Sequence, residues 1–267
     1  MKPLTALLFL LVIISVLVSP LNAVAQQIPG NKETVEIGLS TDTIAITSGF
    51  RGTDLTVFGA LDNADPLIQR QGRYDIVVIL QGPERNFVVR RKDRFFGVWV
   101  NAESVTFQHI PASYSLASTR NLQDIAVPKT FAQLALGVNN IFYEPMPDGF
   151  DSSASLREFT KELPRLKLKQ NLYSQRPGDV QFLSSTLFRA TLSLPANVPV
   201  GKHVARAFLF RNGEFLRESS TSLNIVKAGL EYRIYKAAHE NSLLYGLFAV
   251  FLAVFTGWMG RLMFRKD

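Results

Sequence analysis

Short runs that alternate apolar and polar residues recur along most of the chain. Residues 34–40 and 54–61 alternate clearly, whereas residues 76–79 (Ile-Val-Val-Ile) form a continuous apolar run within 73–80. Alternation is typical of a strand with one buried face, and a continuous short run suits a strand buried on both faces. Further runs at 86–91, 95–100, 104–109, 113–118, 180–183 and 186–194 follow, and most are separated by Gly, Pro, Asn or Asp. This spacing predicts a β-sandwich.

The clearest local signal is Asn212-Gly213, which lies between alternating runs at 205–211 and 214–217. Asn and Gly both accept the positive φ angles of a type I′ turn. The pattern therefore predicts a two-residue β-hairpin, with 220–227 as the closing strand.

A helix interrupts the strands. Residues 122–136 are either helical or irregular, and a helix is expected to begin at Asp151 or the serine after it. Apolar residues at 156, 159 and 163 have helical spacing, and Pro164 ends or kinks the helix. The predicted fold is mainly β: one or two immunoglobulin-like β-sandwiches with an interrupting helix, plus a single C-terminal transmembrane α-helix.

The first 25 residues have the pattern of a secretory signal peptide. A basic start at Lys2 precedes an apolar run over 4–18, and Ala23-Val24-Ala25 provides a cleavage site. We therefore assign 1–25 to a signal peptide. The alternative is an uncleaved helix, but the run is shorter than the roughly 20 residues of a membrane span.

The other end predicts a membrane span. Residues 241–260 carry no charge, which gives about 30 Å of helix, one hydrocarbon thickness. Arg261, Arg265 and Lys266 follow, and positive charge marks the cytoplasmic side. We expect a juxtamembrane helix over 231–240, a transmembrane helix over 241–261 and a cytoplasmic tail over 262–267.

Between the two ends, the pattern divides the body into three segments. Residues 26–125 are predicted to form a periplasmic β-sandwich, 126–167 a linker with a helix, and 168–230 a second β-rich, sandwich-like domain. The lipid bilayer is the predicted partner of the C-terminal helix. Whether the body is one domain or two is left open by the pattern.

The charge of the chain is +7, or +6 without residues 1–25, and its basic residues are spread out. The densest cluster is Arg90, Arg91, Lys92 and Arg94, which we interpret as a solvated face. Export argues against nucleic acid as a partner, and a positive surface suits a position close to anionic lipid headgroups. The chain has no cysteine, which excludes thiol catalysis, c-type haem attachment and Cys-ligated metals.

No sequence motif indicates an active site. His109, His203 and His239 share no ligand spacing, and Asp62, Asn63 and Asp65 suit a turn better than calcium. We therefore predict no catalytic, cofactor-binding or metal-binding residue. The alternative is a site without recognisable spacing, such as one at which Asp54, Asp62 and His109 converge.

Three aromatic residues, Phe95, Phe96 and Trp99, lie close together around Gly97. We interpret them as part of the sandwich core, where large aromatic side chains are common. The alternative is a ligand that packs on one sheet face in the space that Gly97 leaves.

Several segments carry a resemblance to a known family, namely 34–40, 52–61, 187–190, 194–197, 245–246 and 257–258. On these residues the chain resembles the conserved hypothetical transmembrane protein family of Alphaproteobacteria over essentially its full length. The resemblance implies a Gram-negative inner membrane and a periplasmic body. It assigns no catalytic or binding residue. The resemblance further implies neighbouring genes for sulfite-exporter-type permeases, and through them a transporter as partner.

These patterns together predict a single-pass protein of the bacterial inner membrane, with its body in the periplasm and its C-terminus in the cytoplasm. The expected function is a non-enzymatic binding or accessory module that acts on another envelope protein or a transporter. The alternatives are a periplasmic enzyme or small-ligand-binding protein, and a structural envelope spacer. A filled sandwich core with a flat exposed patch would favour the binding or accessory module. A deep pocket with several converging polar groups would favour the enzyme or small-ligand-binding protein.

Overall fold

The body is built on two facing β-sheets. The computed structural model describes residues 33–146 and 153–263. Its four-stranded sheet has the order β1 (Thr34–Leu39), β3 (Gly52–Asp62), β11 (Leu187–Pro195), β10 (Val180–Phe182), and all its pairs are antiparallel. A short helix, α2 (Pro66–Arg70), follows β3.

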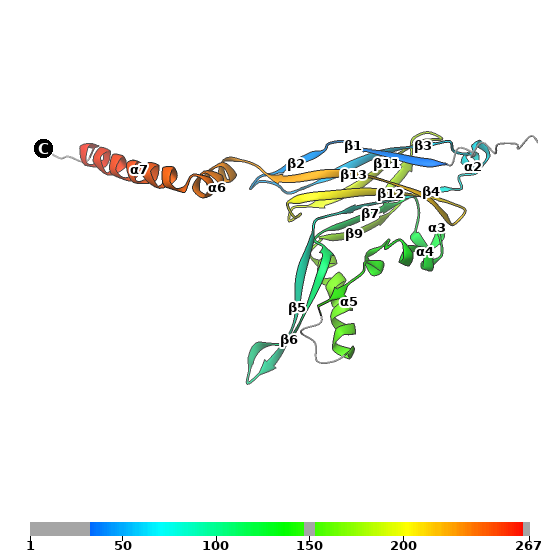
Figure 1. The fold of residues 1–267 in the computed structure, drawn as a ribbon, viewed down its shortest axis with the longest axis horizontal. Helices are drawn as coiled ribbons and strands as arrows, with labels where there is room; N and C mark the ends of the chain where they lie inside the picture. Colours follow the sequence, from blue (N-terminus) through cyan, green and yellow to red (C-terminus); the bar gives the residue numbers. More distant parts are fainter. Residues whose placement is uncertain (1–32, 147–152, 264–267) are drawn as a thin grey trace, which may run out of the picture. The chain divides into compact units, whose positions relative to one another are not determined.

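The second sheet has six strands. Their order is β2 (Thr43–Ile46), β13 (Glu214–Lys227), β12 (Gly201–Arg211), β4 (Tyr74–Gln81), β7 (Tyr114–Ser118), β9 (Tyr173–Pro177). The two outermost pairs, β2 with β13 and β7 with β9, are parallel, and the inner pairs are antiparallel. In Figure 1 the strands of both sheets run side by side through the body.

The main core fills the space between these sheets. Along β3 every second residue from Leu55 to Leu61 is buried, as expected for a strand with one inward face. Its inward side chains form one cluster with those of Ile76, Val78 and Leu80 on β4 and with alternate residues of β12. The predicted mainly β fold, with a sandwich, is therefore confirmed.

The six-stranded sheet is also covered on its outer face. Two short helices, α3 (Leu122–Ile125) and α4 (Pro128–Gln133), and the 3-10 turn η1 (Val138–Asn140) pack there against Val77, Ile79 and Phe208. Both faces of β4 are therefore buried, which explains its continuous apolar run.

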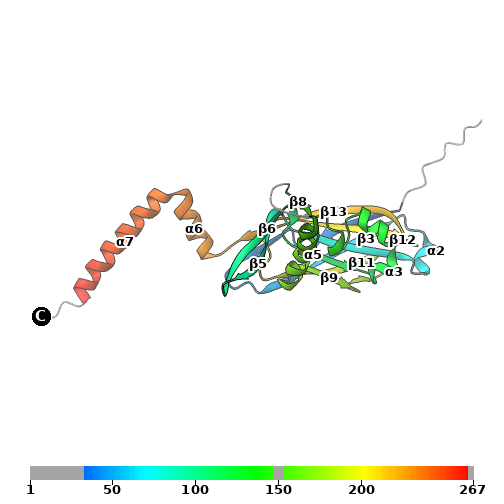
Figure 2. The same cartoon turned by 90° about the horizontal axis from the view of Figure 1, so that it is seen from below.

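A third small core lies in what we call the arm: β5 (Glu84–Phe95), β6 (Val98–Pro111), β8 (Glu144–Pro145) and α5 (Ser153–Lys169). Phe159 and Leu163 of α5 pack on Val89, Val105 and Phe107 of the hairpin. Figures 1 and 2 both show α5 beside the hairpin. The predicted helix is present, and it continues through Pro164 to Lys169; the predicted N-cap lies outside the described residues.

The pairing of strands does not follow the boundaries of the three predicted segments. Both sheets contain strands from 26–125 and from 168–230, and these strands are neighbours, since β3 pairs with β11 and β4 pairs with β12. The described part of 126–167 is not a linker, because Phe131, Leu136 and Val138 are core residues. Long-range strand pairing, which no local pattern encodes, joins these segments into one body.

Two hairpins of the described strands have two-residue turns with the same geometry but different sequences. Asn212-Gly213 has φ angles of 51° and 87° and joins β12 to β13, as predicted. Phe96-Gly97 has φ angles of 48° and 83° and joins β5 to β6, where the sequence pattern had suggested a continuous strand over 95–100. Phe is rare at a positive φ, which explains why this turn was missed.

The interpretation of the three aromatic residues as core was wrong. Phe95, Phe96 and Trp99 lie at the end of the β5–β6 hairpin, where they are 65%, 93% and 65% exposed. The hairpin carries them beyond its last packed residues, since every residue from 92 to 102 is exposed.

Two helices, α6 (Leu230–Glu240) and α7 (Ser242–Met263), follow the last strand. Figure 2 shows α7 as one uninterrupted helix. Its stretch Ser242–Arg261 is long and apolar enough to cross a membrane, and no residue of its most apolar window is buried in the protein. An apolar helix without protein cover supports the predicted transmembrane helix. The predicted signal peptide over 1–25 and the end of the tail lie outside the described residues.

The sandwich core provides a first prediction, at Gly59 on β3. A Cβ atom at this position would overlap the Phe188 ring and lie 2.8 Å from the backbone oxygen of Glu36. Because the oxygen cannot move without breaking the β1–β3 pairing, we expect Gly59→Ala to lower the free energy of unfolding by about 2 kcal/mol. Urea unfolding measures the change.

Gly38 is the matched control, because it lies on the neighbouring strand and a Cβ there meets nothing within 4 Å. We expect Gly38→Ala to change the free energy of unfolding by less than about 0.5 kcal/mol. Equal effects of the two substitutions would contradict the packing described for Gly59.

Candidate functional site

The structure separates the residues of the alternative, converging site. Asp54 and Asp62 lie eight residues apart on one strand, β3, which separates them by roughly 26 Å. His109 lies on β6, with its Nδ1 3.9 Å from the Glu144 carboxylate on β8. The three side chains therefore do not form one site.

The turn after β3 uses its acidic side chains for its own backbone. The Asp62 carboxylate accepts hydrogen bonds from the backbone and side-chain N–H groups of Asn63, at 2.9 and 3.0 Å. Asp65 caps α2 by accepting from the backbone N–H of Leu67 at 2.8 Å. Among the described residues, no group of three or more His, Asp or Glu side chains is placed to hold a metal ion.

His203 forms a buried pair with Ser113 that resembles half of a catalytic triad. Its Nδ1 lies 3.2 Å from the Gly201 carbonyl oxygen and its Nε2 3.2 Å from the Ser113 hydroxyl. Because a carbonyl only accepts, Nδ1 carries the proton and Nε2 accepts from the serine. His203 is fully buried, and Gly82 packs so closely on the pair that a Cβ there would overlap the serine hydroxyl.

Ser113 is 5% exposed and His203 is fully buried, and neither residue lines any of the three clefts described below. The serine oxygen is therefore enclosed by protein in this structure. Burial disfavours the charged imidazolium and lowers the pKa of His203 below its ordinary value of 6.5. The pair serves the packing between β12 and the start of β7.

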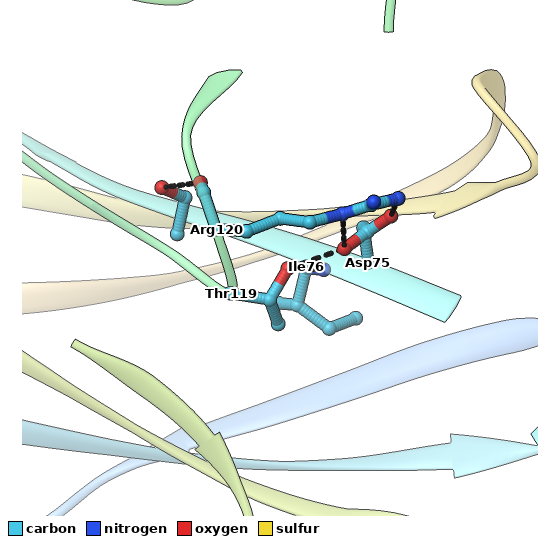
Figure 3. Close-up of polar contacts among 5 residues, drawn as sticks. Asp75, Ile76, Thr119 and Arg120 are labelled. Atoms are coloured by element: carbon cyan, nitrogen blue, oxygen red, sulfur yellow. Dashed lines mark hydrogen bonds and ion pairs between the residues drawn. The ribbon is translucent and has the colours of Figure 1, made fainter. Parts of the chain in front are cut away.

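Asp75 is the most deeply buried carboxylate of the described residues, with 3% of its surface exposed at the start of β4. Figure 3 shows its partners. The Arg120 guanidinium binds both carboxylate oxygens, with Nε 2.9 Å from Oδ1, and the Thr119 hydroxyl donates at 2.7 Å. The hydrogen bonds to Asp75 raise the pKa of Arg120. This cluster joins β4 to the segment after β7 and leaves no oxygen free for a ligand.

Lys167 lies in the arm without an acidic partner among the described residues. Its ammonium group is 3.2 Å from the centroid of the Phe87 ring, and the residue is buried. Burial, together with the nearby Arg85, lowers the pKa of Lys167 to about 8. No described cleft reaches it, so its main contact is the aromatic face.

Of three clefts that the described residues line, the one with the greatest volume, about 620 Å³, lies between β7, β9 and the segment that contains α3, α4 and η1. We call it the carboxamide cleft, because five Asn and Gln side chains line it: Asn121, Gln123, Asn139, Asn140 and Gln175. Leu116, Ala126 and Phe131 supply apolar lining that continues the core. No charged side chain or histidine of the described residues lines it.

Two of the five amides are bound within the protein. Asn140 donates to the Leu136 carbonyl at 2.6 Å, and Asn121 donates to the Asp124 carboxylate at 3.4 Å. The other three residues, Gln123, Asn139 and Gln175, are exposed. Their side-chain amides form no hydrogen bond with another described residue. Each offers donors and acceptors together, so the cleft suits a neutral polar ligand such as a peptide backbone.

A second cleft, of about 450 Å³, shares Asn139 with the first and continues along α5 past Tyr143 and Thr160. A third, of about 560 Å³, is lined by Arg51, Asp54 and Arg176 among others. The sequence pattern drew attention to Asp54 but missed the carboxamide cleft. Its amides come from three separate elements, namely α3 with its N-cap, η1 and β9, and none of them follows a motif.

The sequence model of one protein family matches residues 34–266, and its description reads "Putative transmembrane protein (Alph_Pro_TM)". The chain belongs to this family. The match includes the strands of both sheets, the arm and α7. Membership confirms the predicted resemblance and agrees with a transmembrane role for α7.

Comparison with solved structures adds little. AggA, the major subunit of aggregative adherence fimbriae type I from Escherichia coli, is 8% identical, with a TM-score of 0.26, over 74% of this chain and 97% of its own. The N-terminal domain of the Streptococcus gordonii adhesin Sgo0707 is 12% identical, with a TM-score of 0.23, over 73% of this chain and 33% of its own. Overlaps this low support no argument about fold or function. No curated protein matches the chain.

The Asp75 cluster provides a second prediction. We expect Arg120→Ala to lower the free energy of unfolding by about 2–3 kcal/mol, because it leaves a buried carboxylate with only its hydroxyl partner. The exposure of half of the Arg120 side chain keeps the loss below that of a fully buried pair. Urea unfolding measures it, and Arg165→Ala, which removes the exposed ion pair with Glu162, serves as control.

For Arg165→Ala we expect a loss of less than about 0.5 kcal/mol. If Arg120→Ala were as mild as this control, Asp75 would not depend on its arginine.

A third prediction concerns pH. The pKa of His203 is lowered in the folded protein, so below about pH 6.5 the unfolded chain binds more protons. The contribution of this residue to stability is complete above that pH and is lost as pH falls through the folded pKa. We expect the pH dependence between pH 7 and 5 to be weaker in His203→Gln, as measured by urea unfolding at each pH. An unchanged slope would contradict this assignment.

Proposed function

We propose that the protein is a membrane-anchored binding or accessory module and not an enzyme. It has its body in the periplasm and its C-terminus in the cytoplasm, and it acts on another envelope protein, a transporter included. The observation that carries the proposal is the lining of the carboxamide cleft, which offers hydrogen bonds but no titratable side chain. General acid–base and nucleophilic chemistry need such a group, whereas recognition does not.

The ligand that suits the cleft best is an extended peptide segment of the partner. A peptide backbone presents alternating N–H and C=O groups, and Gln123, Asn139 and Gln175 can pair with both kinds. The apolar lining at Leu116 and Phe131 provides room for a side chain between these hydrogen bonds. The second cleft, which meets the first at Asn139, extends the surface for a longer segment.

The membrane helix supports the same function. An anchor confines the body to a layer next to the bilayer, so that a partner in the same membrane is met at a high effective concentration. Weak contacts in the cleft are then sufficient for function. Arg261 at the end of the apolar stretch, with Arg265 and Lys266 beyond it, supports a cytoplasmic C-terminus.

The experiment is site-specific photo-crosslinking of the full chain in its native membrane. A photoreactive amino acid at Gln123 tests the cleft, and one at Gln181 is the matched control, because that glutamine is also exposed but lies on β10 of the other sheet. We expect a defined peptide of one envelope protein to be joined to position 123 and not to position 181. Capture of the same proteins at both positions would argue against the cleft.

A triple variant, Gln123→Ala with Asn139→Ala and Gln175→Ala, measures the contribution of the amides. Loss of three hydrogen bonds at about 1 kcal/mol each is expected to weaken copurification of that partner by tenfold or more. Unchanged copurification with a folded variant would refute peptide recognition by the amides.

A further inference from the structure

The end of the β5–β6 hairpin exposes more apolar surface than its position explains. We call residues 93–100 the hairpin tip. Its five apolar side chains are all exposed, from 43% at Val100 to 93% at Phe96: Phe95, Phe96, Val98, Trp99 and Val100. An apolar group of this kind on a protein surface marks a contact with another molecule or a membrane.

Phe96 is disfavoured at its position for two independent reasons. Its φ of 48° lies in the left-handed region, where Asn or Gly fits and a large aromatic residue is rare. Its ring is also almost entirely in water. The same protein places Asn at the equivalent position of its other two-residue turn, Asn212-Gly213. A strained, exposed aromatic residue at the apex of a turn indicates that its side chain has a function there.

The apolar residues occur on both faces of the hairpin. Phe95 lies opposite Val98, and the next pair, Arg94 with Trp99, points to the other face because successive residues alternate. A sheet that docks on a flat protein surface needs only one apolar face. A tip with apolar side chains on both faces suits a medium that surrounds it, and the interfacial layer of a bilayer is such a medium.

The charged residues in and beside the tip indicate the kind of bilayer surface that the tip fits. Arg90, Lys92 and Arg94 are exposed, and Asp93 is the one acid among residues 90–100. Arg91 is bound to Glu103 at 2.8 Å and fixes the base of the tip. Basic residues behind an aromatic end match an anionic headgroup layer over an apolar interior.

The chain itself keeps the body near such a surface. Only residues 228–241 connect the end of β13 to α7, and α6, with 11 residues, accounts for about 16 Å of this connection. The bilayer that α7 spans is therefore within reach of the body.

We propose that the hairpin tip inserts its aromatic side chains into the anionic surface of the bilayer that α7 spans, and so forms a second membrane contact of the protein. In this position Phe96 and Trp99 lie at the level of the headgroups, and Arg90, Lys92 and Arg94 lie against lipid phosphates. The two contacts restrict how the body can turn above the membrane. The inference rests on the membrane anchor and is independent of the carboxamide cleft.

Trp99 reports on this contact directly, because Trp258 is the only other tryptophan of the chain. The experiment uses the full chain with Trp258→Phe, reconstituted into vesicles of phosphatidylethanolamine and phosphatidylglycerol that contain brominated lipids. We expect the lipids to quench Trp99 emission, and we expect less quenching in phosphatidylcholine vesicles or at high salt. Emission from Trp99 that is unquenched and typical of water in anionic vesicles would overturn the proposal.

Phe96→Asn tests the apex without a risk to folding, since Asn-Gly is a preferred sequence for this turn. We expect roughly tenfold weaker insertion, seen as a loss of Trp99 quenching, without a fall in the thermal unfolding temperature. Phe142→Asn is the control, because Phe142 is also exposed (78%) but lies outside the tip; it should leave the quenching unchanged.

Two further outcomes would overturn the inference. Equal quenching in anionic and phosphatidylcholine vesicles would remove the role of the basic residues. A photoreactive residue at position 99 that is joined to a protein and not to lipid, in native membranes, would assign the tip to a protein partner. Neither result bears on the cleft, where the probe at Gln123 gives a separate answer.

Discussion

Burial of both faces of the six-stranded sheet is the constraint on which the rest of the structure depends. β4 lies in the middle of this sheet, and seven of its eight residues are buried. One face is covered by the four-stranded sheet and the other by the short helices α3 and α4. Burial on both sides also encloses Asp75, and the carboxylate then needs Arg120 and Thr119 as partners. The hydrogen-bonded cluster is a consequence of the layer arrangement.

The same constraint explains where the accessible sites occur. β7 and β9 are parallel neighbours, so the chain between them must cross over, and it does so with the helices that cover the outer face. The carboxamide cleft forms where these covering turns meet the edge of the sheet. The hairpin β5–β6 is inserted between the sheet neighbours β4 and β7, and it adds a small core of its own. The carboxamide cleft and the hairpin tip therefore lie on the insertions, and the sheets support them.

The arm illustrates how local and tertiary information differ. Helical spacing correctly placed α5, since Phe159 and Leu163 face the hairpin. The aromatic residues at 95–99 were assigned to the core because residues of this kind are usually buried, but the hairpin carries them beyond its last packed residues. The Gly after Phe96 was a signal for a turn. A bulky residue at a left-handed position hid it, because such turns normally carry Asn or Asp.

The sequence by itself determined the features that depend on local patterns: the mainly β class, the helix after Asp151, the Asn212-Gly213 hairpin and the apolar helix α7. It also indicated correctly that Asp62 and Asp65 serve a turn. Only the tertiary structure decided that 26–125 and 168–230 share two sheets, because strand pairing joins residues more than a hundred positions apart. It also decided that Ser113 and His203 meet in a closed site, and that five separate amides line one open cleft. Contacts of this kind arise from the packing of distant segments, and periodicity within a segment carries no information about them.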